Sequence, residues 1–147
     1  MFDKYFDEYE IGEQRVFPGY TITESHVVGF AGIVGDHYPL HMNAEYARSS
    51  RFGQRIAHGF LVLSASSGMF PLVPGIVVAF YGMDDVRFLA PTFLGDTLDC
   101  EHEVIGLRAK DVRAGVVSVR QTLRNQRGEA VCVATLHILI ARGPDGT

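Results

Sequence analysis

The segment from Gly35 to His41, GDHYPLH, combines side chains that can exchange protons. Asp36 supplies a carboxylate and His41 an imidazole, and the rigid ring of Pro39 restrains the backbone between them. An imidazole ionises near neutral pH, so a neighbouring carboxylate can share proton transfer with it. The segment is therefore either a polar turn or a site of general acid–base chemistry, and its composition alone does not decide between them.

Two helices are expected to hold this segment at its ends. Apolar residues recur at helical spacing over residues 24–34. They follow Thr23, whose hydroxyl can accept a free backbone N–H of the first turn, and Gly35 ends the helix. Asn43 is expected to cap a second, short helix over residues 44–47. GDHYPLH would then be a short loop fixed between two helices.

A longer helix is predicted over residues 58–70, HGFLVLSASSGMF. Its residues are apolar or small almost all round, so we expect it to be buried on most of its surface. Gly59 lies at its start, where backbone N–H groups point outward and favour negative charge. A glycine there lets a ligand approach the backbone closely. Gly59 is either a donor to a developing oxyanion or a residue that permits a tight helix entry.

The remaining segments predict a sheet that can wrap this helix. Strands are expected over residues 14–22, 76–80, 85–89, 97–108, 115–124 and 130–141. In residues 115–124 apolar and polar side chains alternate, which indicates a sheet with one face toward water. The connections among the last three strands are too short for crossover helices, so these strands should be antiparallel. The expected fold class is α+β, with a curved antiparallel sheet around one long central helix.

Composition limits the kinds of partner. The chain has 147 residues, 47% of them hydrophobic, and a formal net charge of −4, so we expect one domain over residues 1–147 that does not bind nucleic acid. No apolar run reaches membrane-spanning length, and the first residues lack the pattern of an export signal. These features predict a cytoplasmic protein without a membrane partner, in which Cys100 and Cys132 are reduced.

Three stretches together resemble a known family: GDHYPLHMNAEYA, RIAHGFLVLSASSGM and RFLAPTFLGDTL. They are similar to the MaoC-like dehydratases, and most of all to the single-domain (R)-specific enoyl-CoA hydratases, which have the hotdog fold. The resemblance runs from about Ile22 through the last strand. It implies a hydro-lyase of fatty acid metabolism that reversibly adds water to a trans-2-enoyl-CoA, giving an (R)-3-hydroxyacyl-CoA. It also implies no cofactor beyond the coenzyme A of the substrate, and a homodimer or an assembly of dimers.

The resemblance assigns roles to individual residues. Asp36 and His41 would hold the attacking water, without a decision on which is the formal base, and Gly59 would donate to the thioester oxygen. Ser67 matches a helix serine that supports the pair, although a helix serine also commonly bonds the carbonyl one turn earlier. Tyr38 departs from the pattern, which more often has Asn. Its phenol could close space, or donate to a substrate carboxylate or to the loop.

Some assignments stay open. His58 is expected to support the site by hydrogen bonding rather than to catalyse, and no metal is expected. Four arginines, Arg48, Arg51, Arg55 and Arg87, could meet the phosphates of coenzyme A, and the sequence does not choose among them. An acyl-CoA thioesterase of the same fold is an alternative, because fold alone does not select the activity. A non-catalytic acyl-CoA-binding protein is another, which the departure at Tyr38 keeps open.

Overall fold

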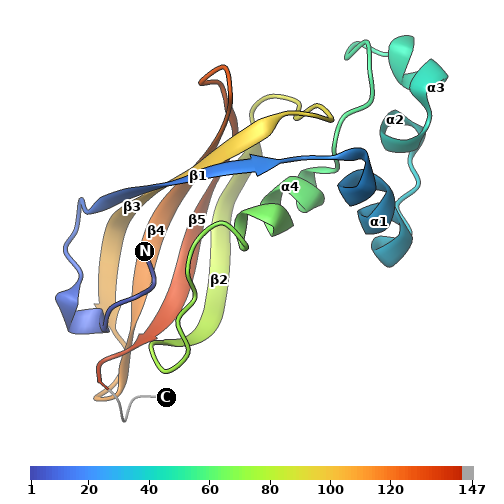
Figure 1. Ribbon diagram of the computed structural model, residues 1–147. Helices are drawn as coiled ribbons and strands as arrows, with labels where there is room; N and C mark the ends of the chain where they lie inside the picture. The colour runs from blue at the N-terminus through green and yellow to red at the C-terminus, as the bar shows by residue number, and fades with distance from the viewer. Residues whose placement is uncertain (144–147) are drawn as a thin grey trace.

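The computed structural model describes residues 1–143, and its centre is a curved five-stranded sheet (Figure 1). The strands are β1 (Gln14–Thr21), β2 (Val77–Phe88), β3 (Thr97–Ala109), β4 (Ala114–Asn125) and β5 (Ala130–Ala141). Their order is β1-β3-β4-β5-β2, and every neighbouring pair is antiparallel. The expected antiparallel sheet is confirmed, and β1 and β2 are its edges.

One prediction about the strands is wrong. Residues 76–80 and 85–89 are predicted as separate strands, but residues 77–80 and 85–88 belong to the one continuous strand β2. The pairing of β2 with β5 shifts between Phe80 and Gly82 and again between Asp84 and Arg87. Extra residues at such bulges interrupt the apolar alternation without ending the strand.

The helices around GDHYPLH begin and end where their caps predict. In α1 (Glu24–Val34) the hydroxyl of Thr23 accepts a hydrogen bond from the backbone N–H of His26, and Gly35 ends the helix with a φ of 76°. Before α3 (Ala44–Arg48) the Asn43 side chain accepts from the N–H of Tyr46. A further short helix, α2 (Pro39–Met42), was not expected. Proline at its first position suits a helix start.

The central helix is shorter and less enclosed than its composition predicts. It is α4 (Gly59–Ser66), and the hydroxyls of Ser66 and Ser67 donate to carbonyls of the preceding turn where it ends. Leu61 and Val62 are buried, whereas Phe60 is 72% exposed. The prediction of burial on most of the helix surface is therefore wrong for a single chain, because the sheet covers only one side of the helix (Figure 1).

The core lies between α4 and the concave face of the sheet. It combines Leu61 and Val62 with inward side chains of β4 and β5 such as Val117, Val119, Leu136 and Ile138. A buried polar chain also joins helix to sheet. His102 Nε2 donates to Gln121 Oε1 over 3.1 Å, and Gln121 Nε2 donates to Ser66 Oγ over 3.1 Å. These bonds fix the position of α4 along the sheet.

A short 3-10 turn, η1 (Phe6–Glu8), precedes β1. Within residues 1–143, no helix combines the length and the apolar content that crossing a bilayer requires. The predicted single domain extends to residue 147, and residues 144–147 lie outside the described residues. Figure 1 places α1, α2 and α3 together at one end of the sheet, beside the start of α4.

Candidate active site

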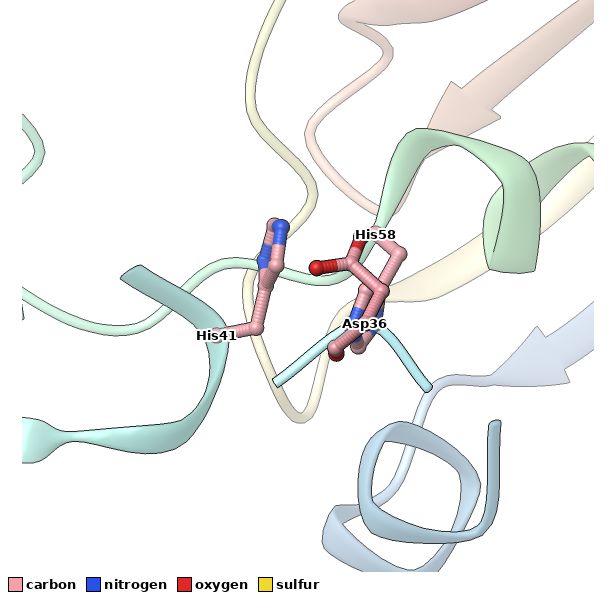
Figure 2. Close-up of side chains that lie close together, drawn as sticks. All are labelled: Asp36, His41 and His58. Atoms are coloured by element: carbon pink, nitrogen blue, oxygen red, sulfur yellow. The ribbon is translucent and has the colours of Figure 1, made fainter. Parts of the chain in front are cut away.

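Asp36, His41 and His58 come together where α1, α2 and α4 meet (Figure 2). Asp36 follows the left-handed Gly35 at the end of α1, His41 lies in α2, and His58 directly precedes α4. Each of the three offers a nitrogen or carboxylate oxygen within 4.8 Å of the others. The backbone N–H of Tyr38 donates to Asp36 Oδ1 over 3.2 Å, which orients the carboxylate. The two sequence-predicted proton carriers are thus neighbours in space.

Backbone carbonyls fix the tautomers of both imidazoles. His41 Nδ1 lies 2.8 Å from the carbonyl oxygen of Ile56, and a carbonyl only accepts, so Nδ1 carries the proton. His41 Nε2 is then free to accept a proton. His58 Nε2 donates in the same way to the carbonyl of Asp36 over 2.9 Å. The pair therefore presents one basic nitrogen on the half-buried His41 and one on the buried His58.

His58 contacts both members of the predicted pair. Its side chain is 2% exposed and its ring lies 4.0 Å from that of His41, centroid to centroid. Its Nδ1 is buried and has no hydrogen-bond partner among the described residues. The phenyl ring of Phe30 lies 5.2 Å away on the α1 side. His58 is therefore placed to hold the backbone at Asp36 and the plane of the His41 ring.

Two cavities meet at this group. The first, of about 500 Å³, is lined by Phe30, Val34, Asp36, His41, His58, Gly59, Phe60 and Ser64. The second, of about 560 Å³, is also lined by His41, Gly59 and Phe60 and extends to the loops at residues 51–57 and 88–92. A substrate that reaches His41 can thus extend into either cavity.

Gly59 is the first residue of α4, and its backbone borders both cavities. His58 makes no side-chain cap, so the N–H groups of the first helical turn are not occupied by a cap. A Cβ atom added at Gly59 would lie 2.7 Å from Cζ of Phe88, so a side chain there would have to displace the ring of Phe88. Next to His41, this helix start can stabilise an oxyanion.

The structure places two predicted site residues away from the cavities. The hydroxyl of Ser67 donates to the carbonyl of Ser64 over 2.7 Å, and Ser67 lines neither cavity. Ser64, one turn earlier, lines the first cavity instead. Because Ser64 follows Phe60 by four residues, the two share a helix face. That spacing is the sequence signal that would have indicated Ser64.

Tyr38 contacts its own loop. Its hydroxyl lies 3.3 Å from that of Tyr46 in α3, and this hydrogen bond raises the pKa of the Tyr38 phenol. Tyr38 lines neither cavity. Of the interactions considered for its phenol, the structure shows the one with the loop.

Asp36, His41 and His58 are also residue types that hold metal ions. A tetrahedral zinc at about 2.0–2.1 Å from each nitrogen needs ligand atoms about 3.3 Å apart. The ligand atoms of the three side chains lie within 4.8 Å of one another, and the two imidazole planes are tilted by 31°. Proton transfer through a bound water does not require the zinc spacing.

Comparison with known proteins agrees with the family resemblance of the three sequence stretches. Residues 7–126 match the family model of the MaoC like domain. The chain is 41% identical to protein MaoC of Klebsiella aerogenes over 99 residues, which are 66% of this chain and 29% of that protein. It is 37% identical to an (R)-specific enoyl-CoA hydratase of Rhodospirillum rubrum over 106 residues, 70% of this chain and 71% of the relative. The chain thus spans under a third of the first relative and about seven tenths of the second.

Solved structures show the same architecture. A monoamine oxidase regulatory protein from Archaeoglobus superposes with a TM-score of 0.89 at 39% identity, covering 96% of both chains. A Mycobacterium tuberculosis protein with a double hotdog fold superposes with a TM-score of 0.86 at 25% identity, covering 97% of this chain and 45% of that one. The predicted hotdog fold and the resemblance based on three stretches are confirmed. The chain belongs to the MaoC-like domain family.

Proposed function

We propose that this protein is an enoyl-CoA hydratase, which reversibly adds water to a trans-2-enoyl-CoA thioester and gives an (R)-3-hydroxyacyl-CoA. The observation that carries the proposal is the placement of Asp36, the free Nε2 of His41 and the helix start at Gly59 around one cavity. Relatives named 3-hydroxybutyryl-CoA dehydratase and (R)-specific enoyl-CoA hydratase support it.

Each of these groups has its own role in the reaction. A water held between the Asp36 carboxylate and His41 Nε2 loses a proton to the pair as its oxygen bonds to the β-carbon. The thioester oxygen gains enolate charge, which the backbone N–H groups at Gly59 stabilise. The pair then returns a proton to the α-carbon, so that one water has been added in total. No redox step occurs, so we infer that no cofactor is needed beyond the coenzyme A of the substrate.

A hydrogen-bonded series elsewhere has the residue types of a hydrolase. The hydroxyl of Ser118 lies 2.8 Å from Nδ1 of His137, whose Nε2 lies 3.0 Å from Asp84 Oδ2. Ser118 alternates with the buried Val117 and Val119, so the series lies on the outer face of the sheet. It lines neither cavity, and the Asp84 side chain is 72% exposed. We therefore assign it to joining β4, β5 and β2 across the outer face of the sheet and not to thioester hydrolysis.

We also propose that the protein is a homodimer or an assembly of dimers. Strand β2 is an edge of the sheet, and it exposes large apolar side chains, among them Phe80 and Tyr81. The uncovered face of α4 adds Phe60. A free edge with exposed apolar side chains is usually covered by another chain. A cytoplasmic location is also part of the proposal, and the buried free thiols of Cys100 and Cys132 support it.

The test is incubation of the purified protein with short, medium, branched and dicarboxylic trans-2-enoyl-CoA thioesters. We expect loss of enoyl absorbance, a mass gain of one water and the (R)-configuration at the new alcohol. Release of coenzyme A with unchanged enoyl absorbance would identify a thioesterase instead. Tight binding of every thioester without a product would identify a non-catalytic binding protein.

A further inference from the structure

Three arginines near the cavities differ in how their charges are balanced. Arg48 forms two hydrogen bonds with the carboxylate of Glu45, and Arg55 pairs with Glu24. Arg51 forms no ion pair with any carboxylate of residues 1–143, and its recorded contact is with the ring of Phe52, 5.7 Å from the guanidinium carbon. Its charge is therefore available to a ligand.

Arg51 also lines the second cavity, together with His41 and Gly59. The other walls of that cavity are mainly apolar, including Phe52, Phe88 and Leu89. No carboxylate is among its lining residues in the described part of the chain. The planar array of N–H donors on a guanidinium matches the oxygens of phosphate and carboxylate.

We propose that Arg51 is an anion subsite of the thioester site. Its guanidinium binds an oxyanion of the substrate, either a phosphate of coenzyme A or a carboxylate on the acyl group, while the reacting carbons lie at His41 and Gly59. This inference rests on the proposed function and adds a specificity-determining residue to it.

The first cavity would repel the same anion. It contains the Asp36 carboxylate, whereas the second cavity does not. An anionic end of the substrate is thus directed into the second cavity, and the other end into the first, past Phe30, Val34 and Ser64. If the anion is a phosphate of coenzyme A, the acyl chain occupies the first cavity.

The experiment compares Arg51→Gln with the matched control Arg48→Gln, whose native arginine is paired and lines neither cavity. Three substrates separate the sources of the anion: crotonyl-CoA, crotonyl-N-acetylcysteamine, which lacks phosphates, and an enoyl-CoA with a terminal carboxylate. Loss of a charge-assisted hydrogen bond should lower kcat/KM by about 10- to 100-fold, mainly through KM.

The pattern of impaired substrates identifies the group that Arg51 binds. If Arg51 binds a phosphate, Arg51→Gln impairs both CoA thioesters and leaves the N-acetylcysteamine thioester unaffected. If it binds an acyl carboxylate, only the dicarboxylic substrate is impaired. The subsite is overturned if Arg51→Gln behaves like Arg48→Gln with all three substrates.

Binding measurements distinguish failure of the Arg51 subsite from failure of the hydratase proposal. If the wild-type protein hydrates none of the three, the hydratase proposal fails. The subsite is then tested by calorimetry with coenzyme A and with a saturated dicarboxylic acyl-CoA. Weaker binding of either ligand to Arg51→Gln than to Arg48→Gln supports it, and equal Kd values for both ligands overturn it. Arg51 is exposed, so neither variant should lower the melting temperature.

Discussion

The imidazoles of His41 and His58 lie against each other, with centroids 4.0 Å apart and planes inclined by 31°. Each ring donates one N–H to a backbone carbonyl, His41 to that of Ile56 and His58 to that of Asp36. These contacts suit a division of roles, in which His41 exchanges protons and His58 holds the ring of His41 in place.

Replacing His58 tests that division. His58→Phe keeps a ring against His41 but removes the donor to the Asp36 carbonyl. Loss of one neutral hydrogen bond should lower kcat/KM by about 2- to 10-fold, and the pH profile should keep its form because His58 does not carry the transferred proton. Steady-state rates across the pH range give both readouts. A loss as large as that of His41→Ala would instead make His58 a proton carrier.

Asp36 and His41 should act as one unit. General acid–base groups typically raise the rate by about 10²–10⁴-fold, so Asp36→Asn and His41→Ala should each lower turnover by a factor in that range. The double variant should be scarcely worse than the worse single one. Asp36 is exposed and His41 half-buried, so the melting temperatures should change little. His37→Ala is the control, since His37 is exposed and lines neither cavity. A normal rate in either single variant would remove that residue from the mechanism.

Ser64 and Ser67 should differ in their effect on substrate size. Ser64 lines the first cavity, so Ser64→Leu narrows it and should raise KM for enoyl-CoA thioesters whose tails enter it, with a smaller effect on a short substrate. Ser67→Ala removes a hydroxyl that donates to a helix carbonyl and should leave turnover unchanged. Kinetics over a series of chain lengths measure both. A large loss of kcat in Ser67→Ala would support the role that the family resemblance assigns to Ser67.

Local features were predicted well because neighbouring residues determine them. The start of α1 depends on a hydroxyl three residues from its N–H partner, and its end depends on the positive φ of Gly35. The bounds of β5 follow from an apolar run between turn residues. Asp36 and His41 are brought together by two short helices in the same stretch of chain.

Features that depend on distant partners were not predictable. Whether α4 is enclosed depends on how far the sheet curves around it, which composition does not encode. Ser64 and Ser67 are the same residue type three positions apart, and they differ because Ser64 lines a cavity whereas Ser67 follows the end of α4 and bonds to its last turn. Arg55 likewise looks like Arg51 until its carboxylate partner is known, and that partner, Glu24, lies in α1, 31 residues away along the chain. Such distinctions arise from tertiary contacts.

Assembly is tested by mass in solution. The exposed apolar residues of the edge strand β2 should be covered by a second copy. Light scattering at micromolar concentration should therefore give at least twice the chain mass of 16.2 kDa. A monomer under these conditions would contradict the proposed dimer.

Stability should fall in mild acid because of His102. This imidazole is 2% exposed among Phe2, Phe17 and Phe70, and burial lowers its pKa from 6.5 to about 4, although the hydrogen bond to Gln121 opposes the shift. The unfolded chain therefore takes up the proton first as the pH falls. The free energy of unfolding should be unaffected by His102 above pH 6.5 and should decrease from there to about pH 4.

The expected loss of stability follows from the size of the pKa shift of His102. Each pKa unit corresponds to about 1.4 kcal/mol, so the loss attributable to His102 approaches about 3 kcal/mol near pH 4. His102→Gln keeps a hydrogen-bonding side chain beside Gln121 but cannot be protonated. Urea denaturation at a series of pH values should show the wild-type protein losing stability relative to His102→Gln below pH 6.5, while the exposed control His37→Gln follows the wild type. Parallel curves for the wild type and His102→Gln would show that burial of His102 does not disfavour its charged form.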